Sequence, residues 1–354
     1  MKGVAFRKAA GLFSLFIIAA LFYFSVVRFA SQLIITTDES SLWISDLESG
    51  SKLNPNTLQS LVALDPFSAD YRYLLAKRAM ATDIPQARAA LNSALRVSPT
   101  DPKLWVLAAW IEGRSGRFAE GMKNFEKSIL LDPWRPDSYA QQGIFITGMP
   151  SFLDASKRSS YLRLAEEDIL FAKKLDPRIT TEPSVALALS SIYREKGEYA
   201  KALNSIQKIT DIEGVDLSFL IHKWALQFDL GDEKGAVADW NRLFIPNSYL
   251  TANLNSLERE IRKQKGADFR YFLAEILRWK GDKQNALSEL VTLNSLKAHV
   301  PEYRLALASL YEETGDLSAA LKAYEEALKI SPSNEPAKRK VIEYYKSSRR
   351  VTKG

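Results

Sequence analysis

PEYRLALASLYEETGDLSAALKAYEEALKISPSN, residues 301–334, is the stretch that decides the fold of this chain. Ala308 and Tyr311 lie on one face of a predicted first helix, and a break at Gly315 separates it from a second helix that ends before Pro332. Each helix carries an apolar face that it cannot bury alone. The two helices are therefore predicted to pack against each other and against neighbouring pairs of the same kind.

The same pattern recurs upstream with a spacing of 34 residues. An insertion around residues 146–158 interrupts the third repeat as a loop, and an extra polar helix is predicted at residues 251–266. Small residues recur where two helices should approach closely, because a larger side chain would push the backbones apart; they are Ala87, Ala165, Ala202, Ala236, Ala286 and Ala320, with Gly121 in the second repeat. The predicted repeats are 68–101, 102–135, 136–179, 183–216, 217–250, 267–300 and 301–334.

This order of aromatic, small and proline positions over 34 residues resembles the tetratricopeptide repeat, and the resemblance covers residues 68–334. It implies an all-α fold, an α-solenoid of about seven helix pairs, that binds other proteins and is not an enzyme. Residues 57–66 resemble the second helix of an incomplete repeat and would cap the start of the array. Residues 335–354 resemble the polar-faced capping helix that closes such arrays, followed by a basic tail.

Composition and charge exclude several classes of protein. Of the 354 residues, 46% are apolar and 25% are charged, which is typical of a folded chain. The net charge of +6 is concentrated at the two ends, so nucleic-acid binding by the repeats is not expected. Because the chain has no cysteine, disulfides, thiolate metal sites and cysteine nucleophiles are excluded.

Residues 9–27, AAGLFSLFIIAALFYFSVV, carry no charge and are long enough, at ~1.5 Å per residue, to cross the ~30 Å core of a bilayer. They predict a transmembrane signal anchor; a cleaved signal peptide is the alternative, but its apolar core would be shorter and would end in a small-residue site. The basic residues of segment 1–8 place the N-terminus in the cytoplasm. Residues 28–56 are predicted to be a spacer, and the repeats to lie on the periplasmic side of a bacterial inner membrane.

Catalytic chemistry is not predicted. The two histidines, His222 and His299, lie in different repeats, and neither has an acidic residue at the spacing of a catalytic triad or a metal site. We therefore expect no catalytic residues, no metal and no cofactor.

The resemblance implies a ligand groove formed by exposed positions of the first helices. Two alternatives remain for these side chains: an aromatic and basic mixture that binds an acidic or aromatic peptide or a polysaccharide, or packing between the repeats. Ala76 and Leu107 stand where a chaperone-type carboxylate clamp would have asparagines, which argues against chaperone C-terminal tails as ligands. The candidate groove residues are Arg72, Trp110, Arg114, Leu187, Arg194, Ile221, Phe228, Tyr271, Arg278 and Trp279.

The sequence therefore favours a bitopic, membrane-anchored scaffold for protein–protein interactions, of the kind found in bacterial envelope or exopolysaccharide assembly. Two other functions stay open: a glycan- or polymer-binding accessory module, and a cytosol-facing import or chaperone-type receptor. The expected partners are proteins, the membrane through residues 9–27, and anionic lipid or an acidic polymer through the basic tail.

Overall fold

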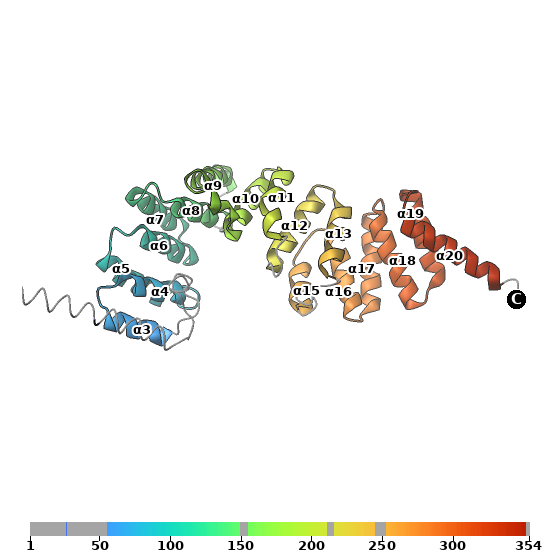
Figure 1. Cartoon of the computed structure of the whole chain (residues 1–354), viewed down its shortest axis with the longest axis horizontal. Helices are drawn as coiled ribbons and strands as arrows, with labels where there is room; N and C mark the ends of the chain where they lie inside the picture. Colours follow the sequence, from blue (N-terminus) through green and yellow to red (C-terminus); the bar gives the residue numbers. More distant parts are fainter. Residues whose placement is uncertain (1–25, 27–54, 149–154, 211–215, 245–252, 352–354) are drawn as a thin grey trace, which may run out of the picture. The chain divides into compact units, whose positions relative to one another are not determined.

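A computed structural model describes residue 26 and residues 55–148, 155–210, 216–244 and 253–351 (Figure 1). These residues form helices joined by short turns, with no strand among them. They divide into two compact parts, an N-terminal unit, Met1–Ala188, and a C-terminal unit, Leu189–Gly354. Each unit is described below by itself.

The N-terminal unit is a succession of antiparallel helix pairs. Within the pairs, α4 packs on α5, α6 on α7 and α8 on α9, and contacts of α5 with α6 and of α7 with α8 join one pair to the next. A single helix, α3, packs on α4 where the half-repeat is predicted. The elements are α3 (Pro55–Leu64), α4 (Ala69–Ala79), α5 (Ile84–Val97), α6 (Pro102–Arg114), α7 (Phe118–Leu131), α8 (Pro136–Gly148), α9 (Ala155–Leu175), the 3-10 helix η2 (Pro177–Thr181) and the beginning of α10 (Pro183–Glu195).

The C-terminal unit continues the same pattern. Pairs α16/α17 and α18/α19 are followed by α20, which packs on α19 in the place predicted for the capping helix, and α15 is the extra helix between repeats. The elements are the remainder of α10, α11 (Tyr199–Thr210), α12 (Leu217–Asp229), α13 (Glu233–Phe244), α15 (Leu254–Arg262), α16 (Phe269–Trp279), α17 (Lys283–Leu296), α18 (Pro301–Thr314), α19 (Leu317–Ile330) and α20 (Glu335–Val351).

The insertion in the third repeat differs from the predicted loop. Helix α8 ends at Gly148 and α9 begins at Ala155, so the later part of the insertion, including Arg158, lengthens the second helix to 21 residues. The stretch ASKRSSYL at the start of α9 contains no glycine or proline, and therefore nothing in it stops the helix from extending toward its N-terminus.

Close approach of helix backbones explains the recurring small residues. Every alanine of the series from Ala87 to Ala320 is fully buried. A Cβ atom on Gly121 would lie 2.5 Å from Phe145 Cζ and 3.0 Å from the Ala109 carbonyl oxygen. The second repeat therefore has glycine instead of alanine because the large Phe145 ring occupies the space that a methyl group would need.

A buried aromatic cluster forms the centre of the C-terminal unit. Phe272 stacks on Trp240 with ring centroids 4.7 Å apart and lies 4.5 Å from the ring of Trp224. Lys223, which stands at a position that is usually apolar in such repeats, is only 5% exposed, and its Nζ lies 2.8 Å from Asp239 Oδ2 on α13. The lysine is tolerated because this carboxylate compensates its buried charge.

The predicted transmembrane segment, residues 9–27, lies outside the described residues except for Val26, and so does most of the predicted spacer 28–56. Within the part of the chain that the structure describes, none of the helices combines the length and the apolar character needed to span a bilayer.

Asp168 on α9 is a buried carboxyl group without a compensating cation. It is 8% exposed, and its Oδ2 makes no hydrogen bond. Burial raises the pKa of Asp168 to about 7, with a further contribution from the negative charge of Glu167; the phenol of Tyr139 on α8 feels the same carboxylate. Folding therefore favours the protonated acid up to about neutral pH.

We predict that Asp168 makes the N-terminal unit less stable as pH rises from about 4 to about 7. In this interval the unfolded carboxyl is ionised while the folded one still holds its proton, so the folded state binds more protons and its stability falls with rising pH. The difference between 3.8 and about 7 corresponds to about 4 kcal/mol. Asp168→Asn should remove this loss and raise the stability at pH 8, measured by denaturant unfolding across pH.

The matched control is Glu126→Gln on α7, which removes an exposed carboxylate. It should leave the pH dependence as in the unsubstituted protein. An Asp168→Asn protein that still loses stability between pH 4 and 7 would show that Asp168 ionises normally in the fold.

Candidate functional site

The predicted groove residues all lie on the first helix of a pair. In the N-terminal unit, Arg72 is on α4, Trp110 and Arg114 are on α6, and Leu187 is on α10. In the C-terminal unit the others are Arg194 on α10, Ile221 and Phe228 on α12, and Tyr271, Arg278 and Trp279 on α16. Their exposure and contacts divide them into three groups.

The first group is buried. Arg72, Ile221 and Tyr271 are 8%, 6% and 4% exposed. Arg72 donates to Ser93 Oγ at 2.9 Å and to the carbonyl oxygens of Ser68 and Pro66, so its guanidinium ties α4 to α5 and to the preceding turn. These three side chains are therefore buried and do not line an exposed groove.

Two arginines form the second group, and each pairs with an acid on the next first helix. Arg194 Nε lies 2.7 Å from Asp229 Oδ2 on α12. Arg278 contacts Glu313 on α18 and Glu275 on its own helix, and donates to Ser309 Oγ at 3.1 Å.

In these pairs, acidic side chains of the protein compensate the positive charge of both arginines. Burial disfavours charged Arg278, but the hydrogen bonds and negative charges of Glu313 and Glu275 together outweigh burial and raise the pKa of Arg278. An acidic ligand would have to displace Asp229 to reach Arg194 and Glu313 to reach Arg278, and Arg72 is buried.

Trp110 and Arg114 form the third group, together with Gln141. Trp110 is half-buried, and its Nε1 donates to Gln141 Oε1 on α8 at 3.1 Å. Its ring makes an edge contact with Phe145, with centroids 5.4 Å apart at 83°. Arg114 follows one helical turn later and is exposed. The contacts hold the indole in one orientation while leaving part of it accessible, which is the arrangement of a preorganised binding residue.

The remaining groove residues contribute less. Phe228 packs against Phe269 and Phe272 with centroid distances of 5.3 and 5.5 Å, so it belongs mainly to the aromatic core. Leu187 is half-buried, and Trp279 at the end of α16 is 49% exposed.

The structure also brings together Ser190 and His222, a pair that sequence spacing did not reveal. Ser190 Oγ lies 3.0 Å from His222 Nε2 and donates to the carbonyl oxygen of Ala202 at 2.8 Å. Burial, followed by the charge of Arg194, lowers the pKa of His222 to about 4. Ser190 is fully buried, so a substrate cannot reach its hydroxyl, and the pair links α10 to α12. Within the described ranges no group of three or more His, Cys, Asp or Glu is arranged to hold a metal.

The carboxylate of Glu312 joins the capping helix to the last repeat. Glu312 on α18 accepts from Tyr324 and Tyr344 at 2.9 Å and from Lys340 at 3.1 Å. Burial alone would raise the pKa of Glu312, but these hydrogen bonds lower it.

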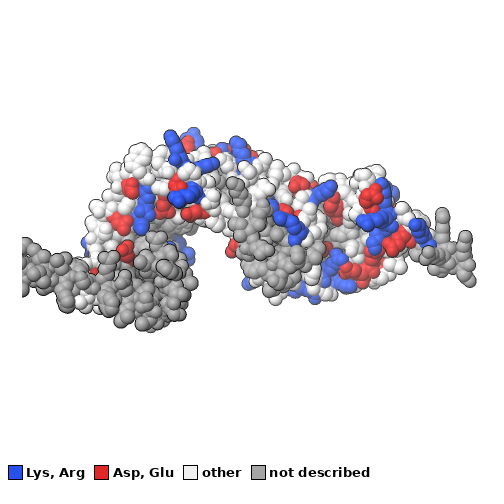
Figure 2. Space-filling model, in the orientation of Figure 1, with Lys and Arg blue, Asp and Glu red and all other residues white. Residues whose placement is uncertain are grey.

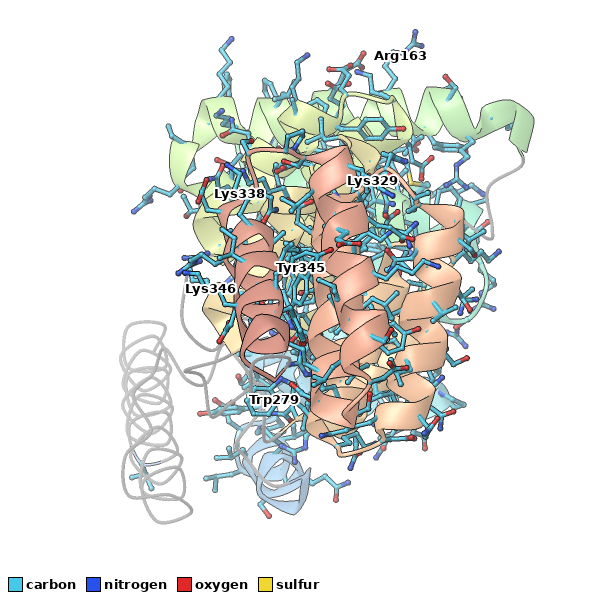
Figure 3. All side chains as sticks on the ribbon, turned by 90° about the vertical axis from the view of Figure 1, so that its right-hand side faces the viewer. Arg163, Trp279, Lys329, Lys338, Tyr345 and Lys346 are labelled. Atoms are coloured by element: carbon cyan, nitrogen blue, oxygen red, sulfur yellow. The ribbon has the colours of Figure 1, made fainter. Side chains whose placement is uncertain are left out.

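Two lysines of the predicted basic tail are therefore already paired with acidic side chains of the protein. Lys340 binds Glu312 and Lys338 binds Glu335, whereas Lys346 points away from α19 in Figure 3. Arg339 is exposed, and the remaining basic residues of the tail, Arg349, Arg350 and Lys353, lie outside the residues whose side chains the structure describes. On the face shown in Figure 2, Lys and Arg side chains are interspersed with Asp and Glu.

Comparison with known proteins identifies the repeat in the C-terminal unit. Residues 301–343 match the model of the tetratricopeptide repeat family. No curated protein sequence matches the chain.

Solved structures with similar folds include the hetero-tetramer Cut9–Hcn1 of the APC/C, with 14% identity, a TM-score of 0.44 and coverage of 82% of this chain and 51% of that one. A tetratricopeptide repeat protein from Parabacteroides merdae shows 12% identity and a TM-score of 0.43, with 81% and 98% covered. PilF of Pseudomonas aeruginosa shows 17% identity and a TM-score of 0.45, with 70% and 99% covered. The family match supports a tetratricopeptide repeat in α18, α19 and the first part of α20.

Proposed function

We propose that this chain is a membrane-anchored scaffold that binds a protein partner through the Trp110 site, defined as Trp110, Arg114 and Gln141. One observation carries the proposal: the indole of Trp110 is held by Gln141 and Phe145 and is still partly accessible beside an exposed guanidinium. Tryptophan and arginine are the residue types that most often dominate the binding energy of protein interfaces. The family match in the C-terminal unit supports a scaffold that acts by binding proteins.

The ion pairs of two groove arginines restrict the class of ligand that the first helices can bind. Arg194 and Arg278 are neutralised by Asp229 and Glu313, so the first helices do not form a continuous basic track for a long acidic peptide. At the Trp110 site a single carboxylate next to an apolar or aromatic side chain would fit, with the carboxylate on Arg114 and the apolar group against the indole. The proposed ligand is therefore a short protein segment of mixed character.

The proposed anchor is residues 9–27, and its orientation rests on charge. Lys2, Arg7 and Lys8 precede the apolar span, and the positive-inside rule keeps such a segment in the cytoplasm. We infer a single-pass protein of a bacterial inner membrane with its repeats in the periplasm and a role in envelope or exopolysaccharide assembly.

Photo-crosslinking in living cells tests the partner site. A photoreactive residue in place of Gly148, which is exposed at the end of α8 one repeat after Arg114, should give one discrete adduct with a protein. Trp110→Ala in the same chain should reduce the yield of this adduct at least tenfold, because the apolar half of the contact is lost. Adduct mass and identity are read by mass spectrometry. Charge reversal by Arg114→Glu, with the photoreactive residue at the same position 148, should reduce the yield as well, and this second variant guards against a Trp110 variant that fails to fold.

The control position is Arg163 on α9, whose side chain is 75% exposed and lies on a second helix. It should not give the adduct. The same adduct from position 163, or an adduct that persists at full yield in both site variants, would show that the partner binds elsewhere. An adduct with a glycan instead of a protein would show that the chain is a polymer-binding module and not a scaffold.

Reporter fusions test the proposed orientation. Alkaline phosphatase fused after Gly354 should be active, because this enzyme becomes active only outside the cytoplasm. Green fluorescent protein fused at the same position should not fluoresce, because it would be exported with the repeats. Replacing Lys2, Arg7 and Lys8 with glutamine should lower the phosphatase activity, since these charges set the orientation. A fluorescent and phosphatase-negative pair would put the repeats in the cytoplasm.

A further inference from the structure

Four equivalent turns lie along one edge of the N-terminal unit. Each joins a second helix to the following first helix and is closed by a backbone hydrogen bond from its fourth residue to its first, at 3.3, 3.4, 3.3 and 3.1 Å in chain order. Because consecutive helices are antiparallel, all these connections fall at the same edge, here called the turn edge. The turns are 65–68, 98–101, 132–135 and 176–179.

The turn edge collects most of the exposed large apolar side chains of its unit. Phe67 is 65% exposed, Leu130 80%, Trp134 76% and Val97 38%, and each lies in one of these turns or within two residues of it. Among the described residues of the N-terminal unit, only Val26 and Leu170 are other exposed side chains of this kind. Large apolar side chains that gather at one edge mark a contact surface.

Charge at the turn edge is balanced. Arg96, Lys103 and Arg178 are exposed there. The aspartates of the same turns are half-buried and accept backbone N–H groups: Asp65 from Phe67 at 3.1 Å and Asp132 from Trp134 at 3.2 Å. Contacts at this edge would therefore depend on the apolar side chains more than on net charge.

We propose that the turn edge lies on the surface of the bilayer, with Phe67, Leu130 and Trp134 inserted at the level of the lipid headgroups. Aromatic residues flanked by exposed basic ones are typical of the membrane interface. The apolar side chains stand on separate turns and not around a shared pocket, and a soft bilayer can accommodate such separate tips without a complementary shape.

The tether strengthens this contact, and in this respect the proposal rests on the proposed membrane anchor. Residues 28–54 lie between the apolar segment and α3. Even at full extension of ~3.3 Å per residue, a segment of this length reaches no more than about 90 Å. The tether thus keeps the N-terminal unit close to the lipid at an effective concentration on the order of millimolar, at which even weak insertion is populated.

Bilayer contact would set the height of the Trp110 site. Helix α6 begins at the turn edge with Pro102 and ends at Arg114. At 1.5 Å per residue, Arg114 lies about 18 Å from the turn edge, at the end of α6 that is farther from the membrane surface. The partner site would then be displayed above the bilayer and remain accessible.

Site-directed spin labelling tests the proposal, and the absence of cysteine allows single labels without background. The full chain is reconstituted into phosphatidylcholine vesicles with a label at Thr100→Cys on the turn edge, at Ala81→Cys on the opposite edge, or at Leu21→Cys in the anchor. Exposure to oxygen, which partitions into lipid, is compared with exposure to a water-soluble nickel chelate. The label at residue 100 should favour oxygen and the label at residue 81 should favour nickel.

Removal of the apolar side chains provides the matched variant. Leu130→Ser with Trp134→Ser should move the label at residue 100 into water and abolish its difference from residue 81, while the label at residue 21 stays in lipid. Vesicles with added phosphatidylglycerol should give the same pattern, because net charge at the turn edge is balanced.

Three outcomes decide the matter. A label at residue 100 in water, with residue 21 in lipid, overturns the bilayer contact and leaves the anchor intact. Residue 21 in water overturns the anchor, and the bilayer contact then stands only if residue 100 favours oxygen. A label at residue 100 that is shielded from both reagents means that protein covers the turn edge, which overturns the proposal.

Discussion

The fold depends on the close approach of helix backbones at residues that have little or no side chain. A Cβ atom on Gly143 would lie 2.5 Å from Ile169 Cγ1 and 3.0 Å from the carbonyl oxygen of Ala165. At such distances the helices of a pair interlock, and the larger apolar side chains around them, such as Phe145 and Ile169, become fully buried. Each pair leaves an apolar face for the next, so stability passes from neighbour to neighbour within a unit.

Helix positions were largely predictable because they follow from local and periodic signals. The Gly315 turn has φ of 86°, a left-handed conformation that glycine adopts readily, and Gly197, Gly231 and Gly281 end first helices in the same way. These signals fix the register of each pair independently of the partner that covers it. Repeat spacing predicts a loop before α9, whereas the structure has a longer helix, because spacing records how many residues are added but not their conformation.

The candidate site was less predictable, because position on a helix gives the face of a side chain but not the groups that reach it from elsewhere. Arg72 is covered by a contact to Ser93, Arg194 by Asp229, and Arg278 by Glu313, all more than twenty residues away in sequence. In the sequence, the only sign that Arg194 and Arg278 pair with the next first helix is an acidic residue about 35 positions later. Trp110 is half-buried and Arg114 is exposed, as expected for groove positions.

The stacking constraint is tested most directly by Gly143→Ala, with Gly148→Ala in the same helix as control, since a Cβ on Gly148 would meet nothing within 4 Å. In an ordinary helix the change from glycine to alanine stabilises by up to about 1 kcal/mol. At Gly143 we expect a loss of about 1–3 kcal/mol from overpacking. Hydrogen exchange should quicken in α8, α9 and their neighbours in the N-terminal unit and stay unchanged in the C-terminal unit. Equal stabilisation by both substitutions, or a uniform loss of protection across both units, would contradict the account.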